Sequence, residues 1–388
     1  MKSKLINRHM WKYIDWVLVI IMLLLVGYGI ISIINATANP FTGDESGFSE
    51  FMENLDLSYA NRQLMFFAIG VGSIFLILLV DYHAVRNLTM FLYLAGVVFL
   101  VIVLQLGTEV NGTTGWFRVG GYGIQPSEFC KITTILALAR VISDKTEGHE
   151  DGITKIRDIW PALWRFAIPF GLIVAQPDIG TAVVYAFIFF IMLFMAKTSW
   201  KILLLLIVLC IVAVLVMYPF LEPYQQNRIQ SWWNPEAQDE DSLLQVNQAK
   251  MAIGSGGLTG KGLFAPGSLS QLDYVPEKHN DFIFAVTVEA LGFLGGAVLI
   301  VLYFFLIGRT FMLAMRAKDD FGAYILVGVA AMTLFHTFEN ISMNVGLLPV
   351  TGIPLPFFSY GGSNLLTNMI AFGIVLSVDM RRTRWPIG

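Results

Sequence analysis

The sequence has little charge for its length. Only 14% of its 388 residues are Asp, Glu, Lys or Arg, whereas a typical soluble domain has about 25%. Apolar residues make up 56% of the chain and the mean hydropathy is +0.67, which excludes an ordinary soluble domain and a disordered chain. A net charge of −3 leaves no basic surface that would argue for nucleic acid binding. These values predict a polytopic membrane protein.

Cysteine is scarce too. Cys130 and Cys210 both fall in apolar runs and form no C-x-x-C pair, so neither a disulfide framework nor a cysteine metal site is expected.

No cleavable signal peptide is expected, because the first apolar run is too long for an h-region and no A-x-A-like site follows it. No internal repeat supports an inverted-repeat transporter.

Long apolar runs are abundant. A helix needs about 20 mostly apolar residues to cross a bilayer, and ten segments meet or approach this length. They are 14–34, 63–81, 88–106, 127–143, 160–176, 179–196, 201–220, 282–308, 322–344 and 363–380. The fourth to sixth are short or carry charges. We therefore predict an all-α fold, a single ten-helix membrane domain over residues 1–388.

The distribution of Lys and Arg indicates the orientation. With the N-terminus in the cytoplasm, most of the 25 Lys and Arg residues fall on the cytoplasmic side, as the positive-inside rule requires. Both termini are then cytoplasmic. Residues 221–281 form a long outer loop that we expect to be ordered. The apolar segment 345–362 contains too many Pro and Gly residues for a helix, so we predict an irregular, re-entrant-like outer loop.

Charged residues in membrane spans need a partner or a function, since each costs about 2.5–3.5 kcal/mol there. Glu128 and Lys131, spaced i, i+3, share a helix face and form either a buried ion pair or the wall of a cavity for an anionic head group. Pro126 and Ser127 predict a helix start with Ser127 as its cap. Asp178 is expected to cap the sixth span.

A polar cluster lies at the mouth of the apolar segment 282–308. It consists of Glu277, Lys278, His279, Asn280 and Asp281. Glu289 lies about 12 Å deeper, at 1.5 Å per residue. Asp281 is either the N-cap of this helix or a carboxylate that transfers protons, and the residues alone favour neither.

Residues 254–262 form a glycine-rich run. The run departs from the phosphate-loop pattern G-x-x-x-x-G-K-[ST], because Ser255 and Gly262 occupy two required positions. A flexible hinge is the preferred interpretation, and a looser contact of Lys261 with a pyrophosphate is the other.

The predicted ninth span carries polar residues at a regular spacing. His336, Asn340 and Asn344 lie four residues apart, with Glu339 alongside. We expect them to form hydrogen bonds between helices. The ridge from Glu339 to Asn344 is also one candidate surface for a partner's membrane helix.

Seven motifs, in order along the chain, carry a family resemblance. They are Gly115-Trp116-Phe117; Gln125-Pro126-Ser127-Glu128 with Lys131; Gln176-Pro177-Asp178-Ile179-Gly180-Thr181; Asn234-Pro235-Glu236; Ala252-Ile253-Gly254-Ser255-Gly256-Gly257 with Gly260-Lys261-Gly262; Pro276-Glu277-Lys278-His279-Asn280-Asp281-Phe282; and Leu348-Pro349-Val350-Thr351-Gly352-Ile353-Pro354 with Ser359-Tyr360-Gly361-Gly362-Ser363. The chain resembles the SEDS family (shape, elongation, division and sporulation), and its RodA branch more than its FtsW branch.

The resemblance implies a ten-span peptidoglycan glycosyltransferase of the bacterial cytoplasmic (inner) membrane, active in cell elongation and shape maintenance. Such proteins polymerise lipid II, a disaccharide-pentapeptide on undecaprenyl pyrophosphate, at the outer face. Their partners are a class B penicillin-binding transpeptidase and other elongation-complex membrane proteins. The family's essential aspartate falls on Asp281, its motif tryptophan on Trp116, and its cavity pair on Glu128 and Lys131.

Together, the residues and the resemblance lead us to expect an inverting glycosyl transfer with Asp281 as the catalytic base. The expected substrate-binding residues are Trp116, Arg118, Glu128, Lys131, Asp178, Lys261, Lys278, His279, Glu289 and Ser359. Lys131, Arg118 and Lys261, in that order, are candidates for stabilising the leaving pyrophosphate. No cofactor is required in this scheme. The alternative is a divalent cation, Mg²⁺ or Mn²⁺, held by Asp281 and Glu289.

Two other functions stay open. A flippase or transporter of the lipid-linked precursor would need polar groups along the full membrane depth, whereas those here lie mainly in the outer half. A non-catalytic scaffold for a transpeptidase would leave the cluster around Asp281 without a role.

The chain departs from the family at Gly115, where Arg is usual and Arg118 is a candidate replacement, and at Glu339, where an apolar residue is usual.

Overall fold

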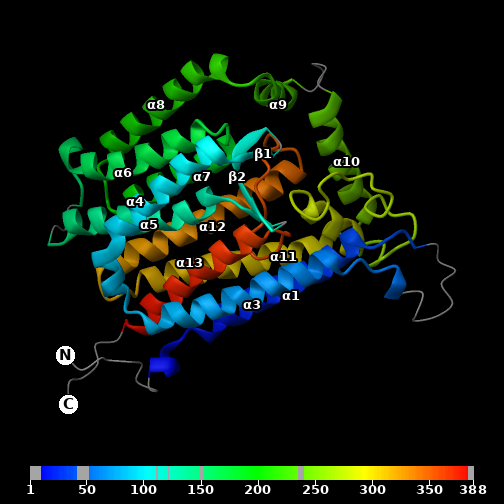
Figure 1. Cartoon of the computed structure of the whole chain (residues 1–388), viewed down its shortest axis with the longest axis horizontal. Coiled ribbons are helices and arrows are strands. Elements are labelled where there is room, and N and C mark those ends of the chain that lie inside the picture. Colours follow the sequence, from blue (N-terminus) through cyan, green and yellow to red (C-terminus); the bar gives the residue numbers. More distant parts are fainter. Residues whose placement is uncertain are drawn as a thin grey trace.

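Each of the ten predicted segments is occupied by a helix, and the long helices run side by side as a bundle (Figure 1). The computed structural model describes residues 10–41, 52–110, 112–120, 122–148, 152–234 and 240–382. Its elements are η1 (Met10–Tyr13), α1 (Trp16–Thr37), α3 (Ser58–Leu79), α4 (Tyr82–Leu106), β1 (Thr108–Val110), β2 (Thr113–Val119), β3 (Tyr122–Ile124), α5 (Pro126–Thr146), α6 (Ile156–Val174), α7 (Ile179–Met195), α8 (Trp200–Met217), η2 (Tyr218–Phe220), α9 (Pro223–Trp233), α10 (Glu240–Gly256), α11 (Ile283–Ala314), α12 (Asp320–Asn344) and α13 (Gly362–Met380).

Among the described residues, seven helices are long and apolar enough to cross a membrane. They are α1, α3, α4, α8, α11, α12 and α13. The other three predicted segments correspond to α5, which buries Glu128 and Lys131, α6, which contains Pro161 and Pro169, and α7, which has 17 residues. The chain is thus a multi-pass helical membrane protein.

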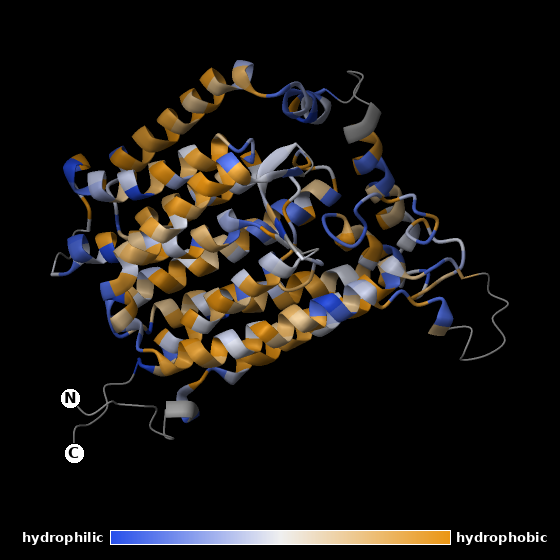
Figure 2. Ribbon diagram, in the orientation of Figure 1, coloured by the Kyte–Doolittle hydropathy of each residue, from blue (hydrophilic) through white to orange (hydrophobic). Residues whose placement is uncertain are grey.

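The two ends of the bundle differ. α1 begins and α13 ends at one end, and α9 and α10 lie at the other (Figure 1). Apolar residues cover the long helices, whereas α9, α10 and the neighbouring loops carry more hydrophilic residues (Figure 2). The segment predicted as a long ordered loop, 221–281, therefore contains two helices and builds up one end of the molecule.

The all-α prediction was wrong between α4 and α5. A three-stranded antiparallel sheet in the order β1-β2-β3 connects them. Glycine and threonine are frequent in this short segment, and its strands have three, seven and three residues. Strands this short carry too few alternating residues for a clear period-two pattern.

The irregular segment 345–361 enters the bundle, as its apolar composition predicted. Phe358 packs against Gly29 of α1, where a Cβ would lie 2.5 Å from the carbonyl oxygen of Phe358. The hydroxyl of Tyr303 on α11 donates to the carbonyl of Pro356 at 2.6 Å, and Gln63 of α3 donates to the carbonyl of Ser359 at 3.0 Å. Irregular backbone is tolerated here because protein groups satisfy its carbonyls.

The glycine-rich run 254–262 does not behave as a free hinge. α11 breaks at Gly292, which has φ of 70° and ψ of −171°. The run packs into this break, where Phe293 N–H donates to the Gly257 carbonyl at 2.9 Å and Gly262 N–H to the Ala290 carbonyl at 2.9 Å. A Cβ on Gly292 would overlap the backbone of the run. The run is therefore a docked structural element.

Candidate active site

Asp281 lies in the turn that precedes α11, with its carboxylate facing Gly352. Oδ2 of Asp281 is 3.6 Å from the position that a Cβ on Gly352 would occupy, and Gly352 has φ of +76°. The N-cap of α11 is Phe282, with no side-chain cap bond. No hydrogen bond to the Asp281 carboxylate occurs within the described part of the chain. The interpretation of Asp281 as a cap was therefore wrong.

Two asparagines of α12 hold the backbone of Asp281. Nδ2 of Asn340 and Nδ2 of Asn344 each donate to the Asp281 carbonyl at 2.9 Å. Asn340 also donates to the Ile353 carbonyl at 2.7 Å, and Oδ1 of Asn344 accepts from Ala285 N–H at 3.2 Å. The predicted hydrogen bonding between helices is confirmed. The spacing of four could not indicate that their target is the turn that carries Asp281.

The same ridge is unavailable to a partner. Glu339, Asn340 and Asn344 are 3%, 0% and 0% exposed. A side chain this buried cannot contact a separate membrane helix, so that candidate surface was wrong.

His279 and Ser359 lie next to Asp281 in the structure. The hydroxyl of Ser359 donates to the Asn280 carbonyl at 2.8 Å, and Tyr360 N–H donates to the His279 carbonyl at 3.0 Å. The imidazole of His279 packs on Tyr59, with 4.6 Å between ring centroids. Burial lowers the pKa of His279, which favours the neutral ring near neutral pH.

The surroundings of Asp281 make its carboxyl a weaker acid. Burial, with a smaller contribution from the negative charge of Glu277, raises the pKa of Asp281 to about 7, and Arg228 acts in the opposite direction. A carboxyl with a pKa near 7 is partly ionised at neutral pH and can accept a proton in a reaction.

A second set of predicted residues lies within the bundle. Nζ of Lys131 donates to Oε1 of Glu128 at 2.6 Å and lies 2.9 Å from Nε2 of His336. Glu128 and Lys131 are 4% and 1% exposed. The predicted ion pair is confirmed, and the participation of His336 is new. Because His336 and Asn340 are one turn apart on α12, this helix contacts both the Lys131 cluster and the turn of Asp281.

Asp178 caps α7, as predicted. Its Oδ1 accepts from Thr181 N–H at 3.0 Å, and its Oδ2 accepts from Nε2 of Gln125 at 3.1 Å. Burial raises the pKa of Asp178. Gln125, and not Ser127, is the N-cap residue of α5, and it makes no side-chain cap bond, so the predicted cap at Ser127 was wrong.

Glu289, Lys261 and Lys278 form a separate cluster with the loop before α11. Oε1 of Glu289 accepts from Nζ of Lys261 at 2.8 Å, and its Oε2 accepts from Ser270 N–H at 3.0 Å. Nζ of Lys278 donates to the Ser270 carbonyl at 2.7 Å and lies 2.6 Å from Oδ1 of Asp273. These residues tie the outer loop to α11.

The hairpin carries the remaining two predicted residues. Trp116 lies on β2, where its ring approaches Gly123 of β3 to within 3.0 Å of the position a Cβ would occupy. Arg118 is on the same strand and is exposed. Ser363 of α13 donates to the Gly123 carbonyl at 3.0 Å, so the sheet is attached to the bundle next to the first residues of α5.

The described residues contain no preformed cluster of metal ligands. Within the described residues, no three His, Cys, Asp or Glu side chains gather so that they could hold a metal ion. Both oxygens of Glu289 already accept hydrogen bonds. Of the two acids in the cation alternative, Glu289 is thus already engaged and only the Asp281 carboxylate is open, and no step below depends on a metal.

Known proteins resemble this chain over nearly its whole length. Stage V sporulation protein E of Bacillus subtilis (strain 168) is 38% identical over 372 residues, which are 94% of this chain and 96% of the relative. Peptidoglycan glycosyltransferase MrdB of Escherichia coli (strain K12) is 34% identical over 336 residues, 84% of this chain and 87% of the relative.

Solved structures also match this chain over nearly its whole length. A chain of a peptidoglycan synthase complex, described for its structural coordination of polymerization and crosslinking, superposes with a TM-score of 0.76 at 28% identity, covering 95% of this chain and 98% of the other. The rod shape determining protein RodA of Thermus thermophilus gives a TM-score of 0.70 at 27% identity, covering 96% and 98%. The model of the cell cycle protein family FTSW_RODA_SPOVE matches residues 15–384, and the chain therefore belongs to this family.

Proposed function

We propose that the protein is a peptidoglycan glycosyltransferase that polymerises lipid II at the outer face of the bacterial cytoplasmic membrane. The relatives named peptidoglycan glycosyltransferase support the reaction class. The observation that supports the site is Asp281, a carboxylate that no described residue hydrogen-bonds and whose pKa is raised to about 7. An acid left free at the polar end of a membrane bundle fits proton transfer better than it fits a structural role.

The proposed step is one displacement. The 4-hydroxyl oxygen of an acceptor GlcNAc attacks C1 of a MurNAc from the face opposite the leaving group. The bond from C1 to undecaprenyl pyrophosphate breaks as the new glycosidic bond forms, and C1 is inverted. Asp281 accepts the hydroxyl proton, and the pyrophosphate leaves with its bonding electron pair. Asn340 and Asn344 hold the backbone of the base, which fixes the position of its carboxylate.

The leaving pyrophosphate needs positive charge near it. Lys131, buried with Glu128 and His336, is the first candidate, and Arg118, an exposed residue of β2, is the second. Lys131 and Lys261 each already donate to a carboxylate, Glu128 and Glu289, so either would have to leave that partner to reach the pyrophosphate. A divalent cation that arrives with the substrate pyrophosphate would act on the same charge, with an open carboxylate such as that of Asp281 as a protein ligand.

The finer topology belongs to the same proposal. We infer ten spans with both termini in the cytoplasm, with α5, α6 and α7 crossing inside the bundle, where neighbouring helices cover their polar groups. A class B penicillin-binding transpeptidase and other elongation-complex membrane proteins are the proposed partners. The structural neighbour from a peptidoglycan synthase complex supports the transpeptidase.

The test is polymerisation of fluorescent lipid II by purified protein in detergent, alone and with the transpeptidase. We expect glycan strands from the wild-type chain and a rate about 10²–10⁴ lower from Asp281→Asn. In detergent there are no separate compartments between which a flippase could move lipid II, and a scaffold has no polymerising activity. Neither would make glycan strands in this assay. Lack of strands under both conditions, from protein that is folded by its melting curve, would contradict the proposal.

A further inference from the structure

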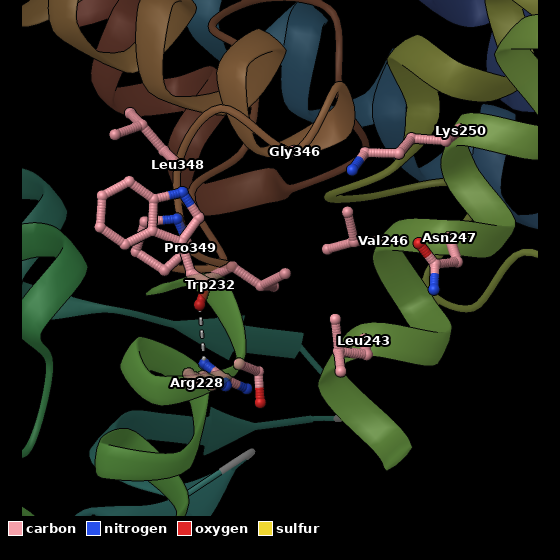
Figure 3. Close-up of a pocket in the computed structure, with 11 residues that line it drawn as sticks. Arg228, Trp232, Leu243, Val246, Asn247, Lys250, Gly346, Leu348 and Pro349 are labelled. Carbon is pink, nitrogen blue, oxygen red and sulfur yellow. Dashed lines mark hydrogen bonds between the residues drawn. The ribbon is translucent and has the colours of Figure 1, made fainter. Parts of the chain in front are cut away.

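A pocket of about 150 Å³ lies between α9, α10 and the irregular segment 345–361 (Figure 3). Arg228, Ser231 and Trp232 line it from α9, Lys250 lines it from α10, and Gly346 from the irregular segment. Pockets that enclose a whole small molecule have about 300–1,000 Å³. This pocket is therefore of a size for one group of a larger ligand.

The pocket contains two cationic side chains, Arg228 and Lys250, that form no ion pair with a described carboxylate, although the charge of Arg228 acts on Asp281. Within the described residues, the guanidinium of Arg228 makes one long hydrogen bond of 3.4 Å, to the Val350 carbonyl, and lies 5.6 Å from the centre of the Tyr224 ring. The ammonium of Lys250 lies against Gly346, where any Cβ would overlap it. Two like charges that face one cavity repel each other unless an anion lies between them.

A buried hydroxyl adds a second, independent indication of a ligand. Ser231 is 3% exposed, and its Oγ has no hydrogen-bond partner among the described residues. Buried polar atoms are nearly always hydrogen-bonded, and Ser231 lines the pocket, so a small rotation of its side chain would let the hydroxyl donate to an acceptor placed there. The indole N–H of Trp232 already donates to the Leu347 carbonyl at 3.0 Å, which leaves its ring as apolar surface.

The pocket is next to the turn that carries Asp281. Val350 lines the pocket, and Gly352, two residues later, faces the Asp281 carboxylate. The other walls are largely aliphatic, with Leu243 and Val246 opposite Trp232 (Figure 3). The chemistry that fits is an oxyanion on a partly apolar stem.

We propose that this pocket is an anion subsite of the glycosyltransferase site and takes a carboxylate or phosphoryl group of the lipid-linked substrate. The inference rests on the proposed function. Lipid II offers this chemistry at the free carboxylates of its peptide and at its pyrophosphate.

The experiment measures equilibrium binding of fluorescent lipid II in detergent, in the Asp281→Asn background so that nothing is turned over. Loss of one charge-assisted hydrogen bond in Lys250→Met should raise the Kd about tenfold, and Ser231→Ala should raise it about threefold. Lys250→Arg, which keeps the charge, should stay within about threefold of the parent. Lys201→Met is the matched control. Lys201 lies in the first turn of α8, at the end of that helix away from α9, and its change should leave the Kd at the parent value.

A second ligand, the same lipid-linked disaccharide without its peptide, separates the two sources. If Lys250→Met weakens lipid II alone, the pocket takes a peptide carboxylate; if it weakens both ligands equally, the pocket takes the pyrophosphate. Unchanged binding of lipid II by folded Lys250→Met and Ser231→Ala would overturn the proposal. So would an effect seen only after the transpeptidase is added, since the pocket would then take an acidic group of that partner. The binding assay needs no polymerisation, so it does not depend on the outcome of the activity test.

Discussion

Asp281 and Glu289 are two acids eight residues apart at the polar end of α11, and their surroundings are opposite. Glu289 is 0% exposed and accepts from Lys261, from Leu269 N–H and from Ser270 N–H. Asp281 is partly exposed, and no described residue hydrogen-bonds its carboxylate. From their positions in the sequence alone, Asp281 and Glu289 could serve the same function, for example as ligands of one cation. Their partners assign Glu289 to holding the outer loop on α11 and leave Asp281 free to react.

The difference shows how a membrane enzyme can keep an unpaired acid. A buried charge without a partner is unstable, so it either finds counter-charges or gives up ionisation. Glu289 has the counter-charge of Lys261 and two backbone N–H donors, whereas Asp281 gives up part of its ionisation, as its raised pKa indicates. The turn around Asp281 is instead fixed through its backbone by Asn340 and Asn344, which leaves the carboxylate unoccupied.

The largest expected effect is that of Asp281→Asn. Asn cannot accept a proton, so polymerisation should fall by about 10²–10⁴, the usual range for loss of a general base. Because the raised pKa means that folding favours the protonated form, the stability from this group is present below about pH 4 and is lost as pH rises to about 7. Asp281→Asn should therefore melt at or above the wild-type temperature at pH 8.

Fluorescent lipid II polymerisation and a thermal melt in the same detergent check both parts. Asp281→Glu is the companion variant, and it should also be weak, since a shift of about 1 Å can cost about 10² in rate. Near-wild-type strand synthesis by folded Asp281→Asn would remove the base assignment.

Glu289→Gln should lower the stability of the protein and leave its activity nearly unchanged, the opposite of Asp281→Asn. Removing one member of a buried, hydrogen-bonded ion pair costs about 3–5 kcal/mol when the other charge stays buried. Lys261 is near the surface at 32% side-chain exposure, so we expect the lower end of that range. Chemical denaturation should show the loss, while polymerisation per folded molecule stays within about threefold. A large loss of activity in fully folded Glu289→Gln would place Glu289 in the chemistry and end the contrast with Asp281.

Asn344→Leu tests how the backbone of Asp281 is positioned. The change removes donors to the Asp281 and Asn340 carbonyls and an acceptor for Ala285 N–H. We expect kcat to fall about tenfold, since the base loses its placement, with little change in the midpoint of the pH–rate profile. Asn344→Asp keeps the acceptor and is the matched variant. A shifted midpoint without a loss of kcat would mean that Asn344 acts on the charge of Asp281 and not on its position.

The sequence predicted the spanning helices well, because the apolar runs that become α1, α3 to α8 and α11 to α13 are mostly long and would be costly to expose to water. It predicted the Glu128–Lys131 pair and the cap at Asp178, since both depend on spacing within one helix. It did not predict the hairpin, whose strands are too short for a period-two pattern. It could not assign Lys261 to Glu289, which lie 28 residues apart, nor place Arg228 near Asp281, because such contacts depend on how the loop folds back.

The smallest effect concerns the charges around Asp281. A general base works in its deprotonated form, so with Asp281 as the proposed base kcat/KM should rise with pH and reach half its maximum near pH 7. Glu277 raises the pKa of Asp281 through its negative charge, so Glu277→Gln should move the midpoint down by about 0.3 of a pH unit, as for one charge acting through a water-like medium. At pH 6 the variant should then be faster than wild type by up to about twofold. Glu53→Gln, another surface glutamate, is the control. A midpoint that stays in place in Glu277→Gln, or moves equally in Glu53→Gln, would mean that the pH profile reports a group other than Asp281.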